Sequence, residues 1–129
     1  MPAVDAIIFN KRGVRKSLKL VLDDGDEVFS CIKQAMKEHT ISEVKVEEMN
    51  GTFKEGELNY FEGNRYKLAN LSGKVSFRAS GLFKLSYDEL YGSMHVSINE
   101  RHPLTGTLVK ARGTEGFEVK LSFVEFHEK

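Results

Sequence analysis

The chain has 129 residues, of which 40% are hydrophobic and 29% are charged, a composition typical of one globular domain with a sizeable core. No apolar run approaches the roughly 20 residues that span a bilayer, and the N-terminus does not resemble a signal peptide, so we expect a cytoplasmic protein with no membrane partner. A single cysteine, Cys31, excludes an internal disulfide and a zinc site built from several thiolates.

Charge is balanced overall, with 19 basic and 19 acidic side chains, which argues against autonomous binding to nucleic acid. It is uneven along the chain, however. We interpret residues 1–13 as an N-terminal arm and residues 14–129 as the domain. The candidate nucleic-acid arm contains the basic residues Lys11, Arg12, Arg15 and Lys16. The alternative interpretation is an ordinary solvated surface.

Two elements that differ in the spacing of their hydrophobic residues follow the arm. Leucines alternate with polar residues from Ser17 to Leu22, which predicts a half-buried strand. An acidic turn at residues 23–26 supplies carboxylates suited to a helix N-terminus. Apolar residues then recur at helical spacing from Glu27 to His39, which predicts an amphipathic helix with Cys31 at the edge of its apolar side.

In the rest of the chain, apolar and polar residues alternate with the two-residue period of β-strands. Alternating, strand-like segments surround Val44, Leu58, Tyr66, Phe77, Phe83, Val96, Leu108 and Leu121, and some of them can belong to the same strand. We place turns at Asn50-Gly51, at residues 62–64 and at Ser80-Gly81. The fold class is therefore α+β: a single domain with a mainly antiparallel sheet of about seven strands packed against one principal amphipathic helix.

The last predicted strand has apolar residues on both faces. Val124 and Phe126 lie on the same side of the strand as the polar residues that precede them, whereas Phe123 lies on the side that faces the core. Because monomers seldom leave such groups exposed to water, Val124 and Phe126 are candidates for a subunit contact. Cover by a loop or by the N-terminal arm is the alternative.

Three segments together resemble the plant-and-prokaryote conserved (PPC) family. They are residues 18–27, a strand that leads through an acidic glycine turn into a helix; residues 66–76, with a Leu-Ser-Gly strand; and residues 94–99, followed by a Gly-Thr-Leu segment at 106–108. The resemblance covers roughly residues 14–126. It implies a homotrimer, and in plants the domain accompanies a DNA-binding AT-hook. The Gly-Arg-Pro core of an AT-hook is absent here, since Gly13 is followed by Val14.

Many prokaryotic members of that family carry three histidines that converge on a metal. In this sequence Ser93 stands at the first of these positions, His95 at the second and Thr107 at the third. Hydroxyl groups are poor substitutes for imidazole, so we expect no bound metal and no other cofactor. Ser93, His95 and Thr107 are the candidate pocket, with a hydrogen-bonded structural role for His95 as the alternative.

No sequence motif of a nucleophile, a phosphate loop or a dinucleotide site is present, so no catalytic residue is predicted. The leading hypothesis is a homotrimeric interaction module without enzymatic activity, for which a regulatory contact with DNA is one candidate role. The competing hypothesis is a small-molecule binder or enzyme that uses a pocket near His95 between subunits.

Overall fold

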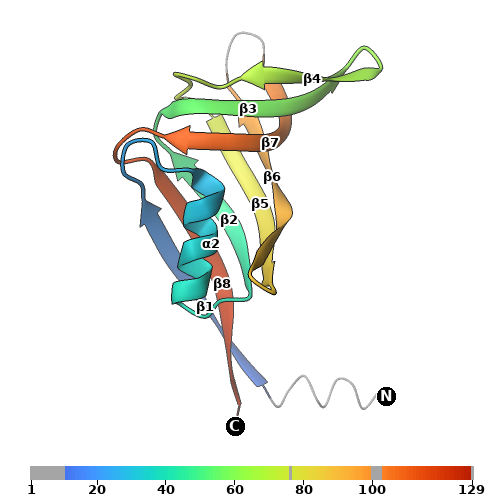
Figure 1. Ribbon diagram of the computed structural model, residues 1–129. Coiled ribbons are helices and arrows are strands. Elements are labelled where there is room, and N and C mark those ends of the chain that lie inside the picture. Colours follow the sequence, from blue (N-terminus) through green and yellow to red (C-terminus); the bar gives the residue numbers. More distant parts are fainter. Residues whose placement is uncertain (1–10, 76, 100–102, 129) are drawn as a thin grey trace.

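The computed structural model describes residues 11–75, 77–99 and 103–128, excluding the side chains of residues 11, 12 and 126–128 (Figure 1). These residues form one helix, α2 (Val28–Glu38), and eight strands. The strands are β1 (Lys11–Val21), β2 (Glu43–Asn50), β3 (Phe53–Glu62), β4 (Arg65–Asn70), β5 (Phe77–Ser86), β6 (Glu89–Ile98), β7 (Leu104–Gly113) and β8 (Glu118–Glu128). Nowhere in the described ranges is there a helix long and apolar enough to cross a bilayer.

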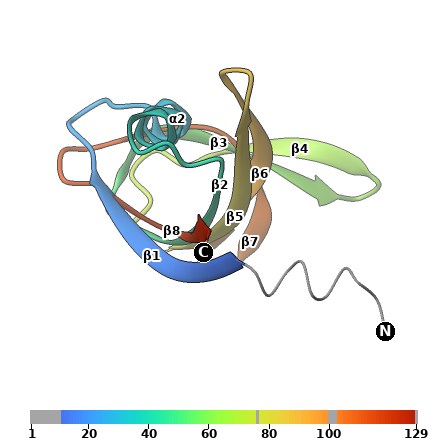
Figure 2. The same ribbon diagram turned by 90° about the horizontal axis from the view of Figure 1, so that it is seen from below.

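All eight strands belong to one antiparallel sheet in the order β1-β8-β2-β5-β6-β7-β3-β4. The sheet is strongly curved, and α2 lies on its concave side (Figure 2). We call this concave side the inner face and the opposite side the outer face. The predicted α+β class with a mainly antiparallel sheet and one principal helix is confirmed, and the described sheet has one strand more than the seven expected.

The core lies between the inner face and one side of α2. Val28, Ile32 and Met36 repeat every four residues along the helix, and all three are fully buried. Alternate residues of the strands meet them, including Val44, Val46, Phe83, Met94, Val96, Val119 and Leu121. Burial of each such side chain contributes about 1.5–3 kcal/mol, so the intervening residues are held on the outer face. No described helix or strand covers that face.

The ends of α2 agree with the predicted range Glu27–His39. Glu27 is the N-cap, and its side chain accepts a hydrogen bond from the backbone N–H of Ser30. His39 is the C-cap, and its backbone N–H donates to the carbonyl of Ala35 over 3.1 Å. Local capping therefore sets both limits of the helix.

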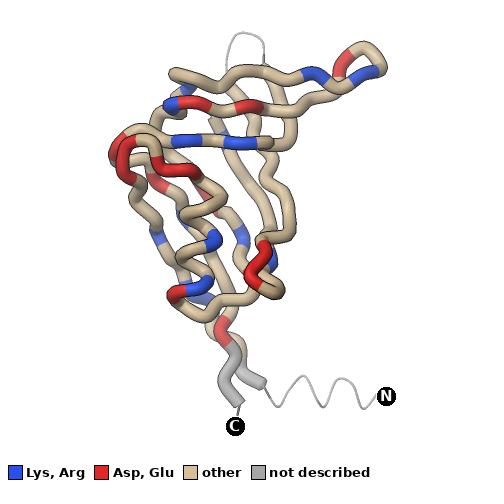
Figure 3. Tube along the Cα trace, in the orientation of Figure 1, with Lys and Arg blue, Asp and Glu red and all other residues tan. Residues whose placement is uncertain are grey.

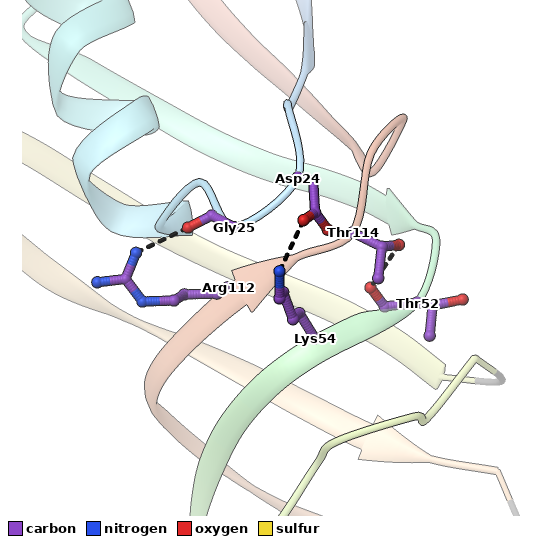
Figure 4. Close-up of polar contacts among 6 residues, drawn as sticks. All are labelled: Asp24, Gly25, Thr52, Lys54, Arg112 and Thr114. Carbon is purple, nitrogen blue, oxygen red and sulfur yellow. Dashed lines mark hydrogen bonds and ion pairs between the residues drawn. The ribbon is translucent and has the colours of Figure 1, made fainter.

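The acidic turn before α2 is tied to β3 and β7 (Figure 4). Lys54 of β3 places its Nζ atom 2.6 Å from Oδ2 of Asp24. Arg112 of β7 donates from Nη1 to the carbonyl of Gly25 over 2.7 Å, and the N–H of Gly25 donates to the carbonyl of Gly113 over 2.9 Å. These contacts fix where the chain enters the helix, which accounts for the acidic cluster as a structural feature.

Two predicted strand boundaries are wrong. Ser80-Gly81 is not a turn, because β5 runs through it to Ser86. Gly81 instead allows close approach of β6: a Cβ atom there would lie 2.5 Å from the carbonyl oxygen of Ser93. The turn comes at Tyr87-Asp88, where both residues have positive φ angles. The first strand begins earlier than expected, at Lys11, so the arm predicted over residues 1–13 overlaps β1, while residues 1–10 lie outside the described part.

The close approach at Gly81 gives a stability prediction. Gly81→Ala forces β5 and β6 apart, because the nearest obstacles to the new methyl group are backbone atoms of Ser93 and Met94. We expect a loss of about 1–3 kcal/mol in the free energy of unfolding, measured by urea denaturation at fixed protein concentration. The control is Ser80→Ala at the neighbouring exposed position, which should stay within about 0.5 kcal/mol of the wild type. Equal stability of the two variants would contradict the strand pairing.

Candidate functional site

The three residues of the predicted pocket lie on the outer face of β6 and β7. His95 faces Thr107 across this strand pair, and its Nδ1 atom is 3.5 Å from the hydroxyl oxygen of Thr107. Ser93 is two positions along β6, opposite Leu82 of β5, and is exposed. The structure thus brings His95 and Thr107 together and places Ser93 beside them on the same face.

A groove of about 450 Å³ adjoins His95 where β2 separates from β5. The two strands pair from Glu43 to Val46 and then diverge. The polar residues that line the groove are Glu47, Glu48, Asn50, Arg78, Ser80, His95 and Ser97. The groove therefore places two carboxylates near His95, a proximity that the sequence did not reveal.

A β-bulge puts both carboxylates at the surface. The register between β2 and β8 shifts between Val46 and Glu48, and the side chains of Glu47 and Glu48 are both exposed. The only sequence signal is the break in alternation at Glu47-Glu48, since a regular strand would expose one residue and bury the next.

Glu47 is the carboxylate with the most defined surroundings. Its Oε1 atom accepts a hydrogen bond of 2.7 Å from the hydroxyl of Ser122, which is itself buried. This bond lowers the pKa of Glu47, and the positive charges of Lys45, Arg15 and Lys120 lower it further. Glu47 is therefore held in its ionised form at neutral pH.

The groove does not form an oriented acid–base site. His95 has one side-chain hydrogen bond to a described residue, that with Thr107, and none to Glu47 or Glu48. A histidine that acts as a general base needs a partner that orients its ring and a substrate within hydrogen-bond reach. The geometry thus resembles a polar binding surface more than a catalytic one.

Four exposed cations lie together on the outer face of β1, β8 and β2. We call Arg15, Lys19, Lys45 and Lys120 the basic strip. Lys19 lies directly opposite Lys120, Arg15 lies opposite Val124, and Lys45 lies opposite Ser122. Two carboxylates offset part of this charge: Glu118 is 3.3 Å from Lys19, and Glu47 is 3.8 Å from Lys45. Figure 3 marks the basic residues along the chain trace in blue and the acidic residues in red.

The basic strip includes Arg15 from the predicted nucleic-acid arm, but not Lys16. Lys16 lies on the other side of β1, where its Nζ atom is 3.1 Å from Oε2 of Glu125. The side chains of Lys11 and Arg12 are outside the described part of the structure. Sequence analysis missed Lys45 and Lys120 because strand register, and not proximity in the chain, brings them to Arg15 and Lys19.

A second exposed feature is the β3–β4 hairpin, which projects from the body of the molecule (Figure 1). We call Phe61, Tyr66 and Leu68 the hairpin patch. Their exposed fractions are 61%, 72% and 62%, and the rings of Phe61 and Tyr66 lie 5.1 Å apart between centroids. Of the predicted subunit-contact residues, Val124 is exposed on the outer face, whereas the side chain of Phe126 is outside the described part.

Comparison with known proteins decides the family. The sequence model of the Plants and Prokaryotes Conserved (PCC) domain matches residues 10–126. The chain belongs to this family. The predicted resemblance to the PPC family, which is the same family under another abbreviation, is thereby confirmed, and it covers almost the whole described chain. No curated protein matches the sequence.

Solved structures share the fold of this PCC domain. One is a plant- and prokaryote-conserved (PPC) protein of Pyrococcus horikoshii, at 21% identity and a TM-score of 0.63, with 92% of this chain and 84% of that chain covered. Another is a "putative DNA-binding protein" of Ralstonia eutropha JMP134, at 14% identity and a TM-score of 0.66, with coverages of 83% and 76%. A third is a metal-containing protein of Archaeoglobus fulgidus, at 17% identity and a TM-score of 0.64, with coverages of 88% and 81%.

The donors of this PCC domain do not fit a transition metal at the predicted pocket. Ser93, His95 and Thr107 supply one imidazole and two neutral hydroxyls, whereas zinc in proteins takes three or four ligands from nitrogen, thiolate or carboxylate groups. Among the described residues, no group of three or more histidine, cysteine, aspartate or glutamate side chains could hold a metal ion. We therefore assign no chemistry that passes through a metal here.

The surroundings of Glu47 predict a pH-dependent contribution to stability. Because its pKa is lower in the folded protein than in the unfolded chain, ionised Glu47 stabilises the fold above about pH 4.3. That contribution is lost as the pH falls through the folded-state pKa. We therefore expect Glu47→Gln to lower the free energy of unfolding at pH 7, and to have a much smaller effect at pH 3, in urea denaturation.

The matched control is Glu48→Gln, which removes the adjacent carboxylate that accepts from Asn50 and not from Ser122. Its stability should follow that of the wild type at both pH values. If Glu47→Gln is as stable as the wild type at pH 7, the proposed environment of Glu47 is wrong.

Proposed function

We propose that this PCC domain is a homotrimeric interaction module, without enzymatic activity, that regulates by contacting DNA. Membership of the family supports the proposal, as do the fold relatives from Ralstonia eutropha and Bacteroides thetaiotaomicron, both described as a "putative DNA-binding protein". The trimer is the assembly that the family resemblance implies. The polar groove beside His95, which lacks an oriented base, gives no support for a reaction.

The observation that carries the DNA contact is the pairing of Lys19 with Lys120 on the outer face. Like charges directly opposite each other destabilise a strand pair, and the ion pair of Lys19 with Glu118 offsets only one of the two charges. Arg15 and Lys45 add positive charge on the same face, close enough to Glu47 to lower its pKa. Such a surface suits a polyanion, since its phosphates neutralise the lysine charges that otherwise repel each other, and binding releases the condensed counterions of the polyanion.

Self-association is supported by the hairpin patch. Three large apolar side chains together on one projecting hairpin are unusual for a monomer, and aromatic residues are enriched in the centres of protein interfaces. The hairpin lies at one end of the sheet, where β4 is the last strand. A contact between two different surfaces of the chain generates a closed ring when the rotation fits, as a trimer requires. Three copies of the basic strip would then strengthen a weak single contact.

The basic strip gives a direct test of DNA association. The double variant Lys19→Gln with Lys120→Gln removes two cations from the outer face. It should weaken binding to a duplex of mixed sequence and reduce the slope of log K against log salt by about 1.8, since each phosphate contact contributes about 0.9. Fluorescence anisotropy between about 30 and 200 mM salt would measure both quantities.

The matched control removes two cations from α2, on the other side of the sheet. Lys33→Gln with Lys37→Gln changes net charge by the same amount but leaves the outer face intact. Its salt slope should equal that of the wild type. Equal losses in both double variants would show that only net charge matters, and a wild-type protein that does not bind DNA at the lowest salt would refute the DNA contact altogether.

The hairpin patch gives a test of assembly. Light scattering coupled to gel filtration should give the wild type a mass three times the 14.6 kDa of the chain. Phe61→Ser with Tyr66→Ser should shift that mass toward the monomer, because it removes the paired rings from the exposed hairpin. The control is Tyr87→Ser, which removes an even more exposed aromatic residue, 98% accessible, from a different hairpin. A monomeric wild type, or a double variant that stays trimeric, contradicts this interface.

A further inference from the structure

The β1–β8 pair extends beyond the rest of the sheet. These strands pair continuously from Lys11 with Glu128 to Val21 with Glu118, whereas β2 pairs only with residues 118–122 of β8. Residues 11–16 and 123–128 therefore have only each other as strand neighbours within the described chain. We call this two-stranded extension the terminal ribbon; it projects at the lower end of the molecule in Figure 1. Six residues per strand give it a length of roughly 20 Å.

The two faces of the terminal ribbon differ in charge. On the inner side, Lys16 is neutralised by its ion pair with Glu125. On the outer side, Arg15 is exposed, and its charge acts on the carboxylate of Glu47 without a direct ion pair among the described residues. Its neighbour across the strand pair is Val124, which is apolar. The outer side thus presents an exposed guanidinium beside a hydrophobic residue and continues into Lys19 and Lys120 of the basic strip.

The dimensions of the terminal ribbon suit one groove of DNA. Two paired strands lie about 4.8 Å apart and measure about 10 Å across with their side chains. The major groove of B-DNA is about 12 Å wide and admits a two-stranded β-ribbon, whereas the minor groove is about 6 Å wide and does not. An arginine on such a ribbon can donate two hydrogen bonds to O6 and N7 of guanine, and an apolar neighbour can contact the thymine methyl group.

We infer that the terminal ribbon enters the major groove with its outer side toward the bases, while the basic strip contacts the flanking phosphates. This inference rests on the proposed DNA association and adds the contacting element and the groove. It differs from a flexible basic arm, in which every positive charge of residues 11–16 would count equally. In the ribbon, adjacent residues of a strand point to opposite sides, so only one of two neighbouring cations can face the bases.

Arg15 and Lys16 provide a matched pair for the test, since they are adjacent, are both exposed and carry the same charge, but lie on opposite sides of β1. With full-length protein and a duplex of mixed sequence at fixed salt, Arg15→Gln should weaken binding by about tenfold. Lys16→Gln should change it less than about twofold, since Lys16 is paired with Glu125. Arg15→Lys keeps the charge but loses the two-pronged donor, and should fall between the wild type and Arg15→Gln.

Methylation of the same duplex identifies the groove. Dimethyl sulfate attacks N7 of guanine in the major groove and N3 of adenine in the minor groove. Bound wild-type protein should protect guanine N7 and leave adenine N3 reactive, and Arg15→Gln should abolish the protection at concentrations where it still binds. Circular dichroism and gel filtration of each variant confirm that the fold and assembly are kept.

The outcomes separate the two proposals. If the wild type binds DNA but Arg15→Gln and Lys16→Gln weaken it equally, or guanine N7 stays reactive, the ribbon inference is overturned while DNA association stands. If the wild type fails to bind the duplex at low salt, the proposed function and this inference fail together.

Discussion

The contact between α2 and the inner face of the sheet is the constraint on which the rest of the structure depends. Val28, Ile32 and Met36 are completely buried in this contact, and each central strand contributes alternate residues to it. Because successive residues of a strand point to opposite sides, burial of one set against α2 places the intervening strand residues on the outer face. The described chain has no second helix to cover that face. The contacts proposed for DNA and for the other subunits therefore lie on the outer face and on the elements that extend from it.

Divergence of strands shapes the outer face. β2 pairs with β5 over only four positions and with β8 only up to Ser122, so it leaves a gap at each end. One gap is the groove beside His95, and the other leaves β1 and β8 as a two-stranded ribbon. The bulge in the pairing of β2 with β8 presents Glu47 and Glu48 together. A short central strand thus accounts for both the polar groove and the projecting ribbon.

Local patterns in the sequence predicted most of the fold. The helix at Glu27–His39 was predictable because its period and both caps lie within a dozen residues, and the β3–β4 turn because Gly63 and Asn64 both suit the positive φ angles they adopt. The turn at Ser80-Gly81 was predicted wrongly because a glycine that permits close approach of a neighbouring strand looks the same in sequence as one that permits a turn. The basic strip and the carboxylates near His95 were missed since both depend on cross-strand register. Register is set by distant pairings, and a one-residue bulge changes which side chains meet.

Side-chain oxidation by hydroxyl radicals, read out by mass spectrometry, tests most directly whether the outer face is the interaction surface of an assembled module. The account predicts that Phe61 and Tyr66 are protected in concentrated protein and become reactive on dilution, while Tyr87, 98% exposed on another hairpin, reacts fully at both concentrations. Addition of duplex DNA should leave the exposed side of α2 as reactive as before. Unprotected Phe61 and Tyr66 in the concentrated protein, or protection confined to α2, would contradict the assignment of recognition to the outer face.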